Sequence, residues 1–137
     1  MKISETTKEK VQKNSQIIFC VLAWTLLISI IIQVSFAALA VFVNDDMWEK
    51  HLAFVRVIEY LPAVMYIFGS AGWVPQKYRA WSMMLFILFN LQYYTTNGWM
   101  GIIHAVLALA IFSISCYVAW GAYKFVLSTR KRERIQV

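Results

Sequence analysis

Apolar residues follow one another along this chain in four long runs, with short polar stretches between them. A helix needs about 20 apolar residues to cross the roughly 30 Å core of a bilayer, and its backbone satisfies its own hydrogen bonds there. The runs are continuous and lack the alternation of a barrel strand. They predict an all-α integral membrane protein, an antiparallel four-helix bundle with spans at about 17–43, 52–72, 80–96 and 100–127.

The composition agrees with this pattern and excludes a soluble domain. Hydrophobic residues make up 61% of the 137 residues and charged residues 15%, whereas soluble domains average roughly 45–50% and 25%. No charged residue lies within 17–44, 62–76 or 80–123, so the charged skin of a soluble protein cannot form. The apolar fraction is also too high for a disordered chain.

The basic residues predict the orientation of the bundle. Loops on the cytoplasmic side of a membrane carry an excess of Lys and Arg. We therefore expect an N-terminal segment (1–16), the bundle (17–127) and a basic tail (128–137), with both termini in the cytoplasm, as in a bacterial inner membrane protein. Eleven of the 13 basic residues lie on that side: Lys2, Lys8, Lys10, Lys13, Lys77, Arg79, Lys124, Arg130, Lys131, Arg132 and Arg134.

This orientation accounts for the net charge of +6, so we expect no nucleic-acid partner. The lipid bilayer is the expected surrounding. A homodimer or a partner in a membrane complex stays open, because nothing in the sequence decides the oligomeric state.

The chain divides into two similar halves at the polar stretch 72–79. Each half contains a Gln in its first run, then a Trp near the turn, then a His at the start of its second run. The spacing from Gln to His is 18 residues in the first half and 12 in the second. This order predicts two related helical hairpins, as is common in membrane bundles: Gln33, Trp48 and His51, then Gln92, Trp99 and His104.

His51 and His104 are the candidate metal ligands. They lie near the starts of two spans that run in the same direction, so the bundle places them at nearly equal depth. Two histidines facing each other across a bundle are a common way to hold haem b, since neutral imidazole is a good ligand for iron. Arg56 is a candidate for binding a propionate. The alternative is that both histidines serve only as hydrogen-bonding groups within the bundle.

Small residues of the first run, including Ser29, Ala37 and Ala40, are candidates to line a haem slot. They also suit close helix packing without any cofactor.

Glu59 is the second candidate, because ionisable residues inside a bilayer suggest a functional site. It lies three residues after Arg56, a spacing that allows an ion pair on one helix. Pro62 follows and is expected to kink the span. A small four-span transporter that uses Glu59 is therefore the alternative function. The polar residues Gln33, Asn90 and Gln92 are expected to form hydrogen bonds between helices.

Several segments carry a resemblance to a family of small uncharacterised bacterial four-span proteins. In the second half, His104-Ala105-Val106-Leu107 replaces the His-Pro-Val-Asn that the family often has. The resemblance implies a four-span membrane protein over about residues 17–125. Its segments are Ile32-Gln33-Val34, Ala38–Val43, Trp48–Phe54, Leu91-Gln92-Tyr93 and Ile103–Ala108.

The Gln and His pattern also resembles the helix pairs of haem A synthase, which has two four-helix bundles with histidines on the second and fourth helices of each. The resemblance places His51 and His104 at the haem-ligand positions of one bundle. The chain has one bundle only, and Glu49 lies two residues before His51 where the synthase tends to have an acidic residue three before. The resemblance therefore implies a haem-binding bundle and not the synthase reaction.

No HExxH, GxSxG, Walker A or GxGxxG motif occurs in the sequence, so hydrolysis, phosphoryl transfer and dinucleotide chemistry have no visible machinery. We expect no catalytic residue. The sequence favours a membrane protein of unknown process that binds haem b for electron transfer or haem handling. The alternatives are the transporter and a non-catalytic accessory subunit of a membrane complex.

Overall fold

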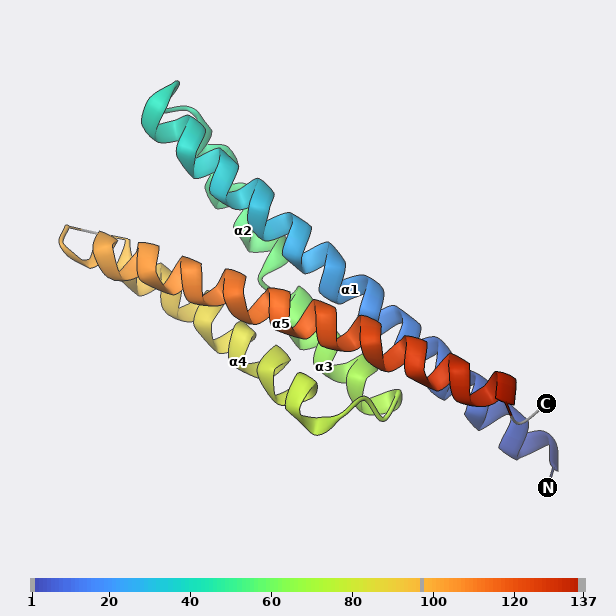
Figure 1. The fold of residues 1–137 in the computed structure, drawn as a ribbon. Coiled ribbons are helices and arrows are strands. Elements are labelled where there is room, and N and C mark those ends of the chain that lie inside the picture. The colour runs from blue at the N-terminus through green and yellow to red at the C-terminus, as the bar shows by residue number, and fades with distance from the viewer. Residues whose placement is uncertain (1, 97, 136–137) are drawn as a thin grey trace.

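The computed structural model describes residues 2–96 and 98–135, with side chains for 6–96, 98–132 and 135, so the side chains of Lys2 and Arg134 lie outside the described residues. The described part is helical without strands, which confirms the all-α prediction. Its elements, shown in Figure 1, are α1 (Lys2–Phe42), α2 (Met47–Ile58), α3 (Leu61–Ala71), α4 (Gln76–Gln92), the 3₁₀ turn η1 (Tyr93–Thr95) and α5 (Met100–Ile135).

Three helical stretches of the described residues are long and apolar enough to cross a membrane. They are Thr6–Phe42, Met47–Ala71 and Met100–Arg132, which correspond to the first, second and fourth apolar runs. Helix α4 has 17 residues, or about 26 Å at 1.5 Å per residue, slightly less than a bilayer core. A third span at about 80–96 therefore stays a prediction.

The second apolar run is divided at Glu59 and Tyr60, where α2 ends and α3 begins. Pro62 lies in the first turn of α3 and has no N–H to donate to the carbonyl four residues earlier. The interruption therefore follows from the proline, and the expected kink is confirmed. It leaves the buried carboxyl of Glu59 at the junction of two helices instead of in the middle of one.

Short turns connect the helices at both ends of the molecule. Between α1 and α2, the Asn44 side chain accepts a hydrogen bond from the Asp46 N–H at 3.0 Å. After α3, Trp73 has a φ of 54°, a left-handed conformation that is uncommon for a bulky residue. The carbonyl of Gly72 there accepts a buried 2.8 Å hydrogen bond from Gln16 Nε2, which ties the end of α3 to α1.

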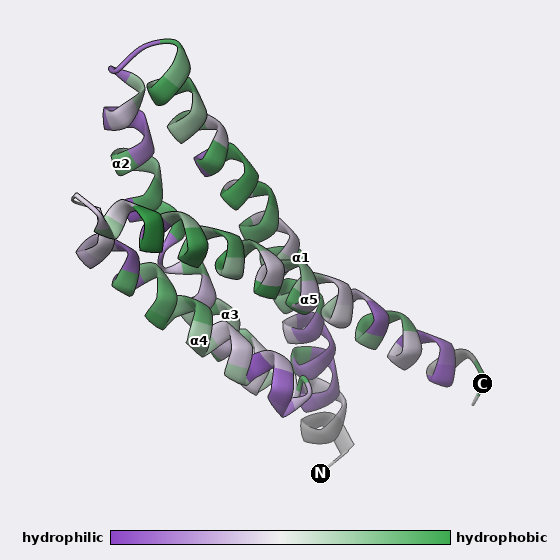
Figure 2. Ribbon diagram, turned by 60° about the vertical axis from the view of Figure 1, so that its left-hand side comes forward, coloured by the Kyte–Doolittle hydropathy of each residue, from purple (hydrophilic) through white to green (hydrophobic). Residues whose placement is uncertain are grey.

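The helices pack closely along part of their length only. Helix α1 contacts α2, α3 and α5, and α4 contacts α3 and α5, whereas α2 packs mainly against α1. Figures 1 and 2 show that α1 and α2 diverge from α4 and α5 toward the connections after α1 and α4. We call this the open end. The largest fully buried apolar side chains include Phe19, Leu26, Met65, Leu85 and Val118.

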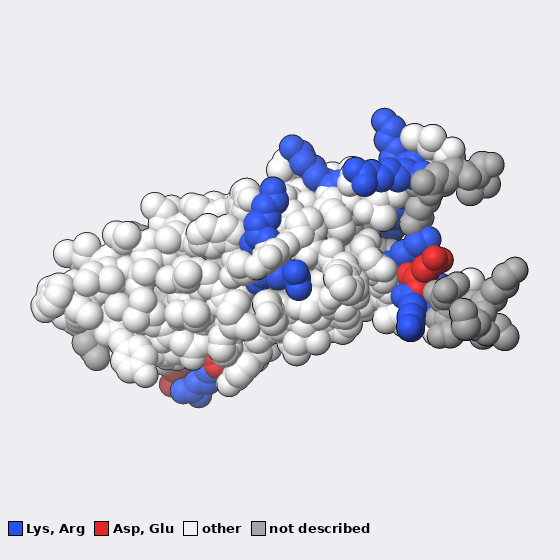
Figure 3. Space-filling view, turned by 90° about the horizontal axis from the view of Figure 1, so that it is seen from below, with Lys and Arg blue, Asp and Glu red and all other residues white. Residues whose placement is uncertain are grey.

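Charged and apolar side chains are segregated along the molecule. Figure 3 shows Lys and Arg gathered toward the end that carries both termini, while most of the visible surface elsewhere is uncharged. We call this the basic end. The helices between the two ends are predominantly hydrophobic (Figure 2). Large apolar side chains point outward along them, such as Val106 and Leu109 at 62% and 67% exposure, which suits a surface that faces lipid.

Candidate functional site

His51 is tied to the preceding helix by two hydrogen bonds that involve one residue, Gln33. The Gln33 side-chain Nε2 donates to the backbone carbonyl of His51 at 2.9 Å. The ring Nδ1 of His51 lies 3.2 Å from the backbone carbonyl of Gln33. A carbonyl can only accept, so Nδ1 carries the ring hydrogen in this hydrogen bond and Nε2 keeps its lone pair.

His104 has the corresponding contact with Gln92. Its Nδ1 lies 3.2 Å from the backbone carbonyl of Gln92 and 3.3 Å from Thr95 Oγ1. When the Gln92 side-chain amide is oriented to satisfy both of its ends, its nitrogen donates to the His104 carbonyl at 3.3 Å. In this orientation the nitrogen also donates to His104 Nδ1 at 2.6 Å, so Nδ1 accepts and the ring hydrogen of a neutral His104 lies on Nε2; the amide oxygen accepts from the Ala108 N–H at 3.0 Å.

The two hairpins thus repeat one local arrangement, which we call the Gln–His clasp: Gln33 with His51, and Gln92 with His104. In each clasp a buried glutamine faces the backbone carbonyl of the histidine, and its own backbone carbonyl lies 3.2 Å from the ring Nδ1. Within the part of the chain that the structure describes, Nε2 of neither ring forms a hydrogen bond. The Gln and His of the sequence order therefore correspond to a repeated contact, whereas Trp99 is 74% exposed and no counterpart of the Trp48 contact is seen among the described residues.

The two clasps lie on opposite sides of the open end, one on α1 and α2 and the other on α4 and α5 (Figure 1). Both histidine rings are half-buried. Helices α2 and α5 have no extensive contact of their own. Trp48 packs edge-on against the His51 ring, with 5.6 Å between the ring centroids.

The described residues show no set of ligands for a bare metal ion. In the described residues no three His, Cys, Asp or Glu side chains gather to hold a metal, and most protein metal sites need at least three ligands. A haem requires only two axial ligands from the protein, because its ring supplies the other four. A histidine whose Nδ1–H is held by a carbonyl and whose Nε2 is free is the usual form of a metal ligand.

Glu59 takes part in a contact that the sequence did not indicate. The Tyr93 hydroxyl donates to Glu59 Oε2 at 2.6 Å, so the buried carboxylate is connected to η1, across the open end. The expected ion pair with Arg56 does not form among the described side chains. Arg56 is exposed instead.

Tyr93→Phe is expected to destabilise the protein by about 1–3 kcal/mol, because it leaves a buried carboxylate without its hydrogen-bond donor. Thermal unfolding in detergent measures the loss. Tyr94→Phe is the matched control, since the neighbouring Tyr94 is 79% exposed and its change should lie within about 0.5 kcal/mol. Equal stability of the two variants would show that the contact between Tyr93 and Glu59 is unimportant.

The other predicted residues are divided between packing and surface positions. Ser29, Gln33 and Ala40 are buried, so they lie in helix interfaces and do not line an open slot. Asn90 is exposed and its side chain donates to the Phe86 carbonyl of its own helix at 2.8 Å, so it does not bond between helices as we expected. Gln33 and Gln92 do form such bonds.

Comparison with known proteins gives one match. Residues 33–98 match a family of unknown function (DUF6220), and this region contains Gln33, His51, Glu59, Gln92 and Tyr93. No curated protein and no solved structure matches the chain, so no resemblance to haem A synthase is found. The family match and the apolar helices fit a small membrane protein of unknown process.

Proposed function

We propose that this chain is a four-span antiparallel membrane bundle that binds haem b between α2 and α5, with His51 and His104 as axial ligands. The basic end is proposed to face the cytoplasm, in accordance with the positive-inside rule, and the open end the opposite side of a bacterial inner membrane. The bound group supplies one-electron redox chemistry, so the process is electron transfer or haem handling.

The Gln–His clasp is the observation that carries this proposal. If the histidines served only in helix packing, nothing would require the same contact with a glutamine to recur in two hairpins whose loops differ in length. Both clasps direct Nδ1 to a carbonyl and leave Nε2 without a partner among the described residues. The tether restricts rotation of each ring, and in His51, whose Nδ1–H faces a carbonyl, it raises the basicity of Nε2 as a ligand.

Exposed cations near the clasps suit the propionates of a haem. Lys50 directly precedes His51, and Arg56 lies on the same helix α2; both side chains are exposed. An Arg binds a carboxylate with two parallel hydrogen bonds, so Arg56 is proposed to bind a propionate.

The absorption spectrum of the purified protein tests the proposal. We expect the reduced protein, prepared from membranes and supplied with haem, to show the sharp visible bands of a low-spin haem with two axial histidines. Cells that overproduce the protein should be supplied with a haem precursor, so that a lack of haem does not limit loading. A preparation that remains colourless after haem is added would overturn the haem site.

Glu59 supports a second candidate function, proton-coupled transport. A buried carboxyl at a helix break, hydrogen-bonded across the open end by Tyr93, is a group whose protonation can be linked to a movement of one hairpin against the other. Helix α2, which packs mainly against α1, is the element that such a movement would displace.

Resistance to toxic cations in cells that produce the protein tests transport. We expect Glu59→Gln to lose any such resistance while Asn90→Ala retains it, since Asn90 is exposed and bonded within its own helix. Resistance that persists in Glu59→Gln would overturn the transport candidate. A stoichiometric partner that co-purifies with the protein, while both histidines can be replaced, would favour the accessory-subunit alternative.

A further inference from the structure

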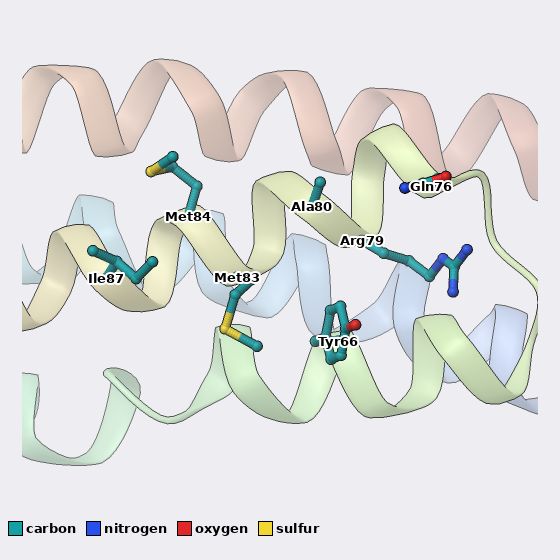
Figure 4. A pocket seen from close by; sticks show the side chains of 7 residues that line it. All are labelled: Tyr66, Gln76, Arg79, Ala80, Met83, Met84 and Ile87. Carbon is teal, nitrogen blue, oxygen red and sulfur yellow. The ribbon is translucent and has the colours of Figure 1, made fainter.

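A groove of about 500 Å³ lies between α3 and α4, away from the two histidines. Figure 4 shows Tyr66 on α3 and the residues from α4 that share the groove with it. The residues from α4 recur every three or four positions, so they form one face of that helix. The lining residues are Tyr66, Gln76, Arg79, Ala80, Met83, Met84 and Ile87.

Arg79 is the charged residue of this groove, and it packs against Gly69 of α3. A Cβ atom at Gly69 would lie 3.1 Å from Arg79 Cγ, so the glycine lets the aliphatic part of the arginine lie directly against α3. Its Nε is buried and has no hydrogen-bond partner. Among the described side chains, no carboxylate forms an ion pair with Arg79, although an unpaired buried donor costs about 1–3 kcal/mol.

The groove changes from polar to apolar along α4. Gln76 and Arg79 lie in the first turn of the helix, at the basic end, and Met83 and Ile87 follow one and two turns later. Met84 and Ile87 are 43% and 53% exposed, so the apolar part is open to the surroundings. This order matches an amphiphile with an anionic head and a hydrocarbon chain.

We propose that this groove binds an anionic phospholipid of the surrounding bilayer, with the phosphate on Arg79 and an acyl chain along Met83 and Ile87. The charge complementarity and the apolar, outward-facing wall favour a membrane lipid over a soluble anion. Basic pockets between membrane helices are known lipid headgroup sites. The proposal rests on the proposed membrane location of the chain but not on haem binding.

Retention of lipid by the purified protein tests this site. The protein is extracted in mild detergent, mixed with phosphatidylglycerol or phosphatidylcholine, and examined by native mass spectrometry. We expect phosphatidylglycerol to be retained preferentially, and Arg79→Gln to weaken its binding about tenfold, the effect of losing one charge-assisted hydrogen bond. Lys77→Gln is the matched control, because Lys77 is exposed, carries the same charge and does not line the groove.

Three results would overturn the proposal: an equal loss in Lys77→Gln and Arg79→Gln, equal retention of phosphatidylcholine, or displacement of the lipid by inorganic phosphate alone. If Arg79→Gln does not fold, Gln76→Glu replaces it. This exposed residue in the first turn of α4 tolerates an acid, and the new charge should repel the phosphate. A sample that retains phosphatidylglycerol but binds no haem overturns only the haem site. A sample that binds haem but does not retain phosphatidylglycerol overturns only the lipid site.

Discussion

His51→Ala and His104→Ala are each expected to abolish the haem spectrum of the purified protein. Each clasp holds one imidazole with its Nε2 unpartnered among the described residues, and the chain has two histidines in total, so no other imidazole can replace a lost ligand. Removing either one leaves at most one axial histidine. The measurement is the reduced-minus-oxidised difference spectrum at equal protein concentration, after haem has been added in excess.

Asn90→Ala is the control for these two variants, because it removes an exposed polar side chain from α4 without touching either clasp. It should retain the full spectrum. Circular dichroism and gel filtration identify variants that fail to fold, and such variants are examined again as His51→Gln or His104→Gln. A folded variant that retains the low-spin spectrum after loss of one histidine contradicts a site shared by α2 and α5.

The repeat of Gln, Trp and His could be read from the sequence, but the clasp could not. Residue order and the expected direction of the spans place the two histidines at the same end of the bundle. The hydrogen bonds of the clasp depend on how the first helix of each hairpin is rotated about its own axis relative to the second helix. Hydrophobic periodicity does not determine this rotation. The different spacings of 18 and 12 conceal the similarity further.

Pro62 explains why the predicted ion pair of Arg56 and Glu59 is replaced by a hydrogen bond from a tyrosine. The expected pair of Arg56 and Glu59 assumes a continuous helix, in which residues three apart are neighbours. Helix α2 ends at Ile58 because of the proline that follows, and Glu59 contacts Tyr93 instead. Tyr93 lies 34 residues away in η1, and no sequence pattern relates the two residues.

The lengths of the helices were predictable in part. The apolar runs 17–43 and 100–127 correspond to the long helical stretches within α1 and α5, because hydrophobicity and length suffice there. The polar segment 1–16 contains no helix-breaking Pro or Gly, yet the sequence did not indicate that α1 begins as early as Lys2. Helix α4 begins after Pro75 and ends at Gln92, so it is shorter than the other long helical stretches.

Gly121→Leu is expected to lower the free energy of unfolding by about 3 kcal/mol, the upper part of the usual range for overpacking. Gly121 is buried on α5, and a Cβ atom there would overlap the ring of Tyr78 on α4. Helices α4 and α5 would have to separate near the basic end. Thermal unfolding in detergent should show a drop of about 10 °C in Tm.

Gly101→Leu provides the matched comparison, because it introduces the same side chain into the same helix where no atom lies within 4 Å of the new Cβ. Its effect should remain within about 0.5 kcal/mol. Adding Tyr78→Ala to Gly121→Leu should recover part of the lost stability, since the two side chains compete for one volume and their effects are not additive. Equal Tm values for Gly101→Leu and Gly121→Leu would contradict the close contact between α4 and α5. If the double variant recovers no stability, Tyr78 is not the cause of the destabilisation in Gly121→Leu.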